Sequence, residues 1–184
     1  MPTPAKTSAD RIVGIARALV ETSGPEALTM GAVASEAGVK PPSLYKHFAD
    51  RAALLKAVEI AIMQDLESTL RRENEGPTPP ARLASLAASY RRFAKAAPNR
   101  YRAIYSGEAF TDPEIREVCL FAAQPLFEAL RAAGVAEARV LPLARTFTAF
   151  LHGFVLMEIG NAFNLGGSVD EAFESGLATL LRDL

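Results

Sequence analysis

Apolar residues recur every three to four positions along most of the chain, and stretches in which polar and apolar residues alternate are almost absent. This spacing is typical of one face of an α-helix, whereas a half-buried strand has a spacing of two. The first helix is predicted after Ser8, with Asp10 in its first turn, where the helix dipole favours negative charge. It ends at Ser23-Gly24-Pro25. The pattern therefore predicts an all-α protein.

Three further helices are predicted before residue 73. The first covers 29–36 with a threonine N-cap, and Gly38 can take the left-handed conformation that ends it. The second covers 41–48 and begins with a proline, whose missing N–H costs little at that position. The third covers 50–72 with an aspartate N-cap. Its expected buried face consists of Leu54, Leu55, Val58, Ile62, Leu66 and Leu70.

The segment 73–80, ENEGPTPP, is the clearest interruption of the chain, since three prolines and a glycine require a turn or loop. Beyond it the pattern predicts helices at about 81–97, 100–105, 113–133, 140–163 and 169–181. Pro125 should kink or interrupt the third of these. The segment 140–163 is apolar over much of its circumference.

Composition narrows the class of protein. The chain has 184 residues, of which 49% are hydrophobic and 22% charged, and this favours a packed globular interior over disorder. Charges should break each apolar run well before the roughly 18 residues of a bilayer span, and the first ten residues lack a secretory signal. A single cysteine, Cys119, fits a reducing cytoplasm. The net charge is −1, but residues 1–56 carry +2.

The segment 29–48 offers the clearest chemistry. The segment is predicted to form a helix-turn-helix motif, with a four-residue turn between its two helices. This motif sets its second helix, the recognition helix, into the major groove of DNA. Val39 and Leu44 should fill the core between the two helices. The outward side chains are Pro42, Ser43, Tyr45, Lys46 and His47, which offer a cation and hydroxyl or ring donors to phosphates and base edges. Taken singly, an aromatic residue or a histidine here could equally be an ordinary surface or core residue.

The match extends beyond spacing. Residues 29–48, with the flanking helix 8–23 and the following DRAALLKAV, resemble the N-terminal domain of the TetR family of bacterial transcriptional repressors, above all in the LYxHF pattern at 44–48. The segment FLHGFVLMEIGNAF, 150–163, is similar to a His-Gly-containing helix in one subgroup of the family's C-terminal domains. The tryptophan often found just upstream of that helix is missing here.

The resemblance implies an Ω-shaped all-α homodimer, whose two recognition helices would enter successive major grooves about 34–36 Å apart. It divides the chain into a DNA-binding domain, 6–66, and an effector-binding and dimerisation domain, 67–184. The DNA-contacting positions it implies are Thr29, Lys40, Pro41, Pro42, Ser43, Tyr45, Lys46, His47 and Arg51. Two departures stand out: Lys40 replaces a frequent serine cap, and the Pro41-Pro42 pair leaves few donors early in the recognition helix.

A cavity in the C-terminal part would take a small apolar or amphipathic effector. Its candidate lining is Phe110, Phe121, Phe127, Phe150, His152 and Met157, although such residues at helical spacing are more often core or dimer seam. The segments 140–163 and 169–181 are expected to pair between two copies as a four-helix bundle. The arginine pairs 71–72 and 91–92 are predicted to lie on solvated faces.

These patterns together predict a cytoplasmic, ligand-responsive transcriptional regulator, a repressor that an effector releases from a double-stranded operator. Two alternatives remain open: a helical sensor or interaction module without specific DNA binding, and an all-α enzyme. An enzyme, a metal site or a cofactor site is not expected, since the chain has only two histidines and no HExxH, P-loop or nucleophile-elbow pattern.

Overall fold

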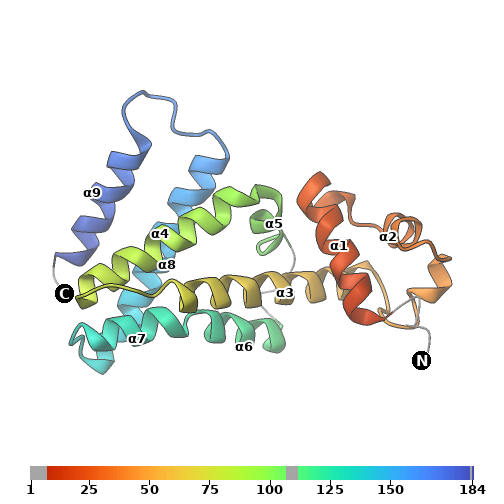
Figure 1. Ribbon diagram of the computed structural model, residues 1–184, viewed down its shortest axis with the longest axis horizontal. Coiled ribbons are helices and arrows are strands. Elements are labelled where there is room, and N and C mark those ends of the chain that lie inside the picture. Colours follow the sequence, from red (N-terminus) through yellow and green to blue (C-terminus); the bar gives the residue numbers. More distant parts are fainter. Residues whose placement is uncertain (1–7, 107–111, 183) are drawn as a thin grey trace. The chain divides into compact units, whose positions relative to one another are not determined.

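The computed structural model describes residues 8–106, 112–182 and 184 (Figure 1). All elements in these residues are helical, and no strand occurs among them, which confirms the all-α prediction. They are α1 (Ala9–Ser23), η1 (Pro25–Ala27), α2 (Met30–Ala37), η2 (Pro41–Ser43), α3 (Arg51–Arg72), α4 (Pro79–Ala96), α5 (Pro98–Ala103), α6 (Pro113–Ala122), α7 (Gln124–Ala132), α8 (Glu137–Ile159) and α9 (Val169–Leu181), where η denotes a 3₁₀-helix.

The described residues pack into two compact units. The first takes its residues from Met1–Asp65 and Ala97–Cys119, and the second from Leu66–Ala96 and Leu120–Leu184. The helices α3 and α6 contribute residues to both units. The resemblance implies one boundary in the sequence, at residue 66, whereas each compact unit combines two separate segments. The boundary at residue 66 therefore stays a prediction.

The first unit forms as its local signals predict. The Ser8 hydroxyl oxygen accepts a hydrogen bond from the Arg11 backbone N–H (3.2 Å), which caps α1. The buried face of α1 consists of Ile12, Ala16 and Val20. The Asp50 carboxylate accepts from the Ala53 backbone N–H (2.8 Å) at the start of α3. All six apolar residues expected on the inner face of α3 are buried.

The predicted α-helix over 41–48 is wrong. The chain there forms the short 3₁₀-helix η2 followed by hydrogen-bonded turns, with the Leu44 N–H donating to the Pro41 carbonyl (2.9 Å). Lys40 and Pro41 each precede a proline, and a residue in that position is disfavoured in the α conformation. Lys40 is accordingly extended, with a ψ angle of 145°. The segment is too short to recover a regular α-helix before Phe48.

In the second unit the predicted break at Pro125 is confirmed. The helix α6 ends at Ala122 and α7 begins at Gln124, so the proline lies in the first turn of a new helix. The last two helices are also present, but α8 begins three residues before the predicted start and ends at Ile159 instead of Phe163. Gly160 caps it, and Asn161 then turns the chain with a φ of 53°.

The helix α8 has two apolar faces. One is buried and is made of Val140, Ala144, Phe147, Leu151 and Val155. The other exposes Leu141, Leu156 and Met157. By length and composition alone α8 could cross a membrane, since Arg145 is its only charged residue between Val140 and Met157. Arg145 and Glu158 nevertheless bound the uncharged run 146–157, so the run ends before the roughly 18 residues of a bilayer span, as expected.

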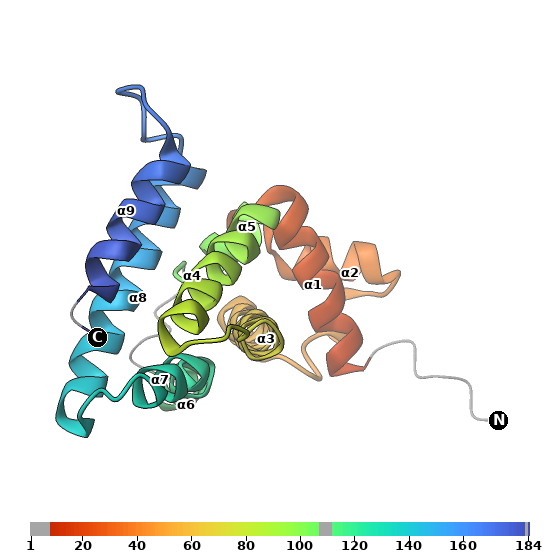
Figure 2. The same cartoon turned by 60° about the vertical axis from the view of Figure 1, so that its left-hand side comes forward.

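An aromatic cluster joins α8 to α9, which lie side by side (Figure 2). The ring of Phe173 stacks on Phe150 with centroids 5.8 Å apart and meets Phe154 edge-on at 5.1 Å. The two helices approach closely where α9 has a glycine. A Cβ atom on Gly176 would lie 2.6–2.7 Å from the ring of Phe150, well inside van der Waals contact.

Replacing Gly176 by alanine is therefore expected to destabilise the second unit. The added methyl must displace a packed ring at a cost of about 1–3 kcal/mol, which exceeds the gain of about 0.5–1 kcal/mol from alanine inside a helix. Urea unfolding measures the difference. Gly14→Ala in α1 is the matched control, because a Cβ there meets nothing within 4 Å and should give only the helical gain. Equal stabilisation by both changes would contradict the close approach.

Arg91 ties three helices of the second unit together. From α4 its Nε and Nη2 donate to both carboxylate oxygens of Glu158 on α8, at 2.7 and 2.6 Å. Nη2 also lies 2.6 Å from the Asp170 carboxylate on α9, and the guanidinium stands 4.7 Å from the centroid of Phe173. The Arg91 side chain is only 12% exposed. The prediction that this arginine lies on a solvated face is wrong, because periodicity does not show ion pairs between helices.

Candidate nucleic-acid interface

The turn between α2 and η2 is built by backbone geometry. Gly38 has a φ of 67°, the left-handed region that ends a helix, as predicted. The Val39 N–H then donates to the Ala34 carbonyl (3.0 Å), and the Gly38 N–H donates to the Ser35 carbonyl (3.1 Å). These two bonds satisfy helix-end carbonyls and direct the chain sharply into η2.

A small core holds this turn in place. Leu44 is fully buried, as are Val33 and Ala34 on α2. Val39 and Phe48 are half-buried at its edge. Because Leu44 is fully buried, it anchors the residues after η2 to the core of the first unit. The predicted core role of Leu44 is confirmed.

The residues around this core present unpaired polar groups to solvent. Tyr45 is 53% exposed, which is unusual for a large aromatic side chain. Lys40, Lys46 and His47 are exposed as well, and within the described part of the chain their side chains make no hydrogen bond or ion pair. Pro41 and Pro42 are exposed and Ser43 is half-buried. Two lysines without acidic partners, an imidazole and a phenol thus surround one short segment.

Thr29 has a structural task that leaves it a free donor. Its hydroxyl oxygen accepts from the Ala32 N–H (3.1 Å) and so caps α2. A threonine hydroxyl can accept and donate at once, so its proton remains available to an acceptor outside the chain. The positive end of the α2 dipole lies at the same place. A phosphate oxygen is the kind of acceptor that such a site suits.

Arg51 also has a structural task, which no local sequence pattern indicates. Its Nε donates to the Leu28 carbonyl (2.6 Å) and its Nη2 to the Pro25 carbonyl (2.8 Å). These bonds tie the start of α3 to the segment that joins α1 to α2. A contact between Arg51 and phosphate stays a prediction. It would use Nη1, which has no partner among the described residues.

The predicted effector residues differ in their surroundings. Phe110 falls outside the described residues. Phe121 is 51% and Met157 47% exposed. Phe127 is half-buried beside Arg131, and Phe150 belongs to the aromatic cluster. His152 is half-buried on α8, and burial lowers the pKa of its imidazole below the usual value. Their role in effector binding stays a prediction.

A groove that the sequence did not indicate lies between α4 and α9, within the second unit. Its volume is about 500 Å³, and none of the described candidate residues lines it. The lining consists of Ala84, Ala88, Arg91, Arg92, Lys95, Asp170, Phe173, Glu174 and Leu177. The small alanines on one face of α4 are the only sequence feature that could have suggested it.

Two family models match this chain. The family described as "Bacterial regulatory proteins, tetR family" matches residues 12–58, and the "Tetracyclin repressor-like, C-terminal domain" matches residues 83–180. A curated relative, the HTH-type transcriptional regulator Rv0681 of Mycobacterium tuberculosis, is 33% identical over 160 residues, which cover 85% of this chain and 72% of the relative.

Solved structures share the fold over nearly the whole chain. A protein of unknown function from Rhodococcus sp. RHA1 has a TM-score of 0.82 and 26% identity, and the match covers 100% of this chain and 98% of that one. A TetR variant from Acinetobacter baumannii AYE, in complex with minocycline, has a TM-score of 0.72 and 22% identity over 96% of both chains. At that identity the second likeness concerns the fold alone.

Proposed function

Because this chain belongs to the TetR family of DNA-binding transcriptional regulators, we propose that it is a ligand-responsive repressor that a small apolar or amphipathic effector releases from its operator. The observation that carries the DNA-binding part is the group of unpaired, exposed side chains around η2: Tyr45, Lys46 and His47 with Lys40. They project from a turn that is fixed by Gly38 and Leu44, so their positions are set before DNA arrives.

We assign different tasks to these residues. Thr29, Tyr45 and His47 would anchor phosphates, while Ser43 and Lys46 would reach base edges, with apolar contact from Pro41 and Pro42 to thymine methyl groups. Lys40 and Arg51 complete the proposed interface. Because η2 is short and its two prolines carry no N–H, side chains rather than backbone donors would supply the polar readout.

DNA from upstream of the protein's own gene is expected to shift in a gel, with binding that weakens as salt increases. Tyr45→Ala and Lys46→Ala should each abolish most of this shift, because each removes an exposed contact without touching the core. Circular dichroism checks that both variants stay folded. Full binding by both folded variants would refute the assigned interface and favour a helical sensor without specific DNA binding.

The regulatory part of the proposal rests on the family and on the layout of the chain. An effector would bind best to a conformer whose recognition segments are wrongly spaced for the operator, and it can release DNA only to the extent of that preference. The helix α3 contributes residues to both units and is the proposed lever. We retain a 6–66 DNA-binding domain and a 67–184 effector domain as the proposed division, and the cytoplasm as the proposed location.

We propose further that two copies pair through α8 and α9. The exposed apolar face of α8, with Leu141, Leu156 and Met157, supports this arrangement, since a face of that kind needs a cover in water. A four-helix bundle of two α8 and two α9 helices would provide that cover. The same pairing explains why α8 is apolar enough to resemble a membrane span.

A further inference from the structure

The groove between α4 and α9 has one apolar end and one charged end. Its apolar part consists of Ala84 and Ala88 on α4 with Phe173 and Leu177 on α9. The charged part holds Arg91, Arg92 and Lys95, which follow one another along α4. A groove of about 500 Å³ falls within the range typical of sites for small organic ligands. Its two ends match a molecule with an apolar body and a charged head.

The cations at the charged end differ in the donors they still offer. Arg91 is occupied by Glu158 and Asp170. Arg92 uses only Nη2, which donates to the Glu73 carboxylate (2.5 Å) and to Ser89 Oγ (3.0 Å). Within the described residues its Nε and Nη1 have no partner, and its side chain is 64% exposed. The Lys95 ammonium, 47% exposed, donates once, to Glu158 (2.5 Å).

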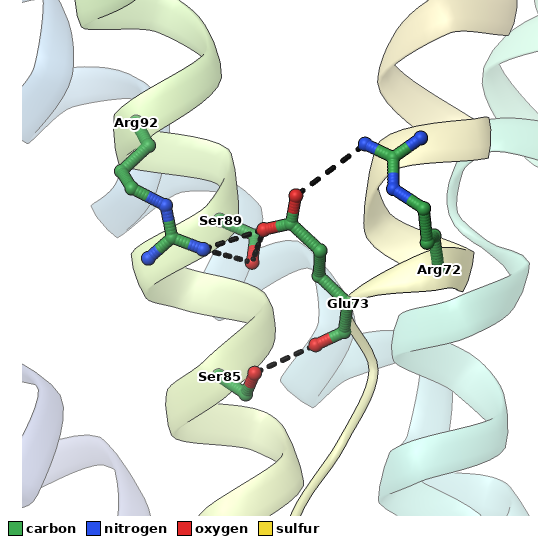
Figure 3. Close-up of polar contacts among 5 residues, drawn as sticks. All are labelled: Arg72, Glu73, Ser85, Ser89 and Arg92. Carbon is green, nitrogen blue, oxygen red and sulfur yellow. Dashed lines mark hydrogen bonds and ion pairs between the residues drawn. The ribbon is translucent and has the colours of Figure 1, made fainter.

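Arg92 is held in place before any ligand arrives. Figure 3 shows one terminal nitrogen of its guanidinium on Glu73 and Ser89, while the other terminal nitrogen points away from them. Glu73 is itself fixed, because its carbonyl accepts from the Ser85 hydroxyl (2.6 Å) and its carboxylate from Ser89 (2.8 Å). Hydrogen bonds from Ser89 and Arg92 hold the pKa of Glu73 below its usual value, so the carboxylate stays ionised. Such anchoring reduces the entropy that a bound ligand would cost.

The acids that face the groove come from α9. Asp170 is already paired with Arg91. Glu174 lines the groove, is exposed, and has no partner within the described residues. Glu174 would repel an anion, whereas Arg92 and Lys95 would attract one, although Glu73 and Glu158 already offset part of their charge. Because Nη2 of Arg92 is occupied, Nε or Nη1 can each give a carboxylate one charge-assisted hydrogen bond, and the Lys95 ammonium can give another.

We propose that the α4–α9 groove binds an amphipathic carboxylate, with its carboxylate on Arg92 and Lys95 and its apolar chain on Ala84, Ala88 and Leu177. This inference deepens the proposed function. Only an effect of the ligand on DNA binding would depend on that function. The binding of the carboxylate is a property of the second unit alone.

Calorimetric titration with decanoate, below its micelle concentration, tests the site in the full chain. One decanoate per chain is expected, with decan-1-ol binding at least about tenfold more weakly because a charge-assisted hydrogen bond is lost. Arg92→Gln and Lys95→Gln should each weaken decanoate about tenfold or more. Ala88→Phe should abolish binding, because the larger ring fills the groove.

Two control variants make the result specific. Glu174→Gln removes a repelling charge and should tighten decanoate binding. Arg116→Gln removes an exposed cation that has no partner among the described residues and lies outside the groove, and it should change nothing. The proposal is overturned if decanoate does not bind, or if it binds to the Arg92, Lys95 and Ala88 variants as tightly as to the native chain. It is also overturned if decylammonium binds more tightly than decanoate and Glu174→Gln weakens the binding of decylammonium. Thermal unfolding confirms that each variant is folded.

The effect on DNA is measured separately. If decanoate binds as described and releases operator DNA, both the site and the ligand-responsive function hold. If it binds and leaves DNA binding unchanged, the site holds, while the proposed release by this ligand fails. Operator binding in the absence of decanoate tests the interface around η2 and does not depend on the groove.

Discussion

Arg91→Met is expected to lower the free energy of unfolding of the second unit by about 3–5 kcal/mol, as for a buried ion pair that loses one partner. The change leaves the Glu158 carboxylate, whose side chain is 12% exposed, with only Lys95, and it releases Asp170 and Phe173 of α9. Urea unfolding measures the loss. Arg116→Met removes an exposed arginine whose side chain has no partner in the part of the chain that the structure describes, and it should change stability by less than about 0.5 kcal/mol. Similar small effects for both variants would contradict the role of Arg91.

The same pair has a signature in pH. Hydrogen bonds from Arg91, and then from Lys95, hold the pKa of Glu158 below its ordinary value of 4.5. A carboxyl whose pKa is depressed in the folded state stabilises the fold above the unfolded value, and this contribution is lost as pH falls below about 4.5 through the folded pKa. Glu73, Asp112 and Glu137 have lowered pKa values as well. The Arg91→Met variant should therefore lose less stability on acidification than the native chain. Part of the acid-induced loss should remain, because these other carboxyls still titrate.

Met157→Glu is expected to raise the dissociation constant of the proposed dimer by about a hundredfold to a thousandfold, because a buried, unpaired carboxylate costs several kcal/mol. Met157 is 47% exposed on α8, so the fold of one chain should tolerate the change. Sedimentation equilibrium measures the association. A charge at Phe154 is a poorer test, since that ring packs on Phe163 and Phe173 within one chain. Leu165, 99% exposed, remains a clean second site.

Gln64→Glu places the same charge on an exposed polar position of α3 and is the matched control. It should leave the dissociation constant unchanged. A native-like dimer from both Met157→Glu and Leu165→Glu would show that neither the outer face of α8 nor the loop after it takes part in pairing.

Local signals predicted most of the fold. Caps at Ser8, Thr29 and Asp50, the left-handed Gly38 and the break at Pro125 each act within a few residues, so sequence reasoning could find them. The 41–48 segment was the exception. The predicted start at Pro41 is confirmed, but the two X-Pro steps replace the expected α-helix by a 3₁₀ turn.

The parts that could not be predicted depend on contacts between distant residues. Arg91 and Glu158 are 67 positions apart, and Arg51 meets the Pro25 carbonyl from 26 positions away. Nothing in helical periodicity separates such arginines from solvated ones. The groove likewise exists only because α9 approaches α4, where Phe173 lies beneath the Arg91 guanidinium. The DNA-facing residues were accessible to sequence reasoning because they lie in one continuous motif.

The central claim is that the side chains around η2 contact DNA phosphates and bases, and the salt dependence of operator binding tests it most directly. The logarithm of the association constant should fall linearly with the logarithm of salt concentration, and each phosphate contact contributes about 0.9 to the slope. Because Lys46 is assigned to a base edge, Lys46→Gln should lower the affinity at an unchanged slope. A slope reduced by about 1.8 would instead place Lys46 on a phosphate in each half-site of a dimer. Arg116→Gln should alter neither quantity. Native slope and native affinity in Lys46→Gln would contradict the claim.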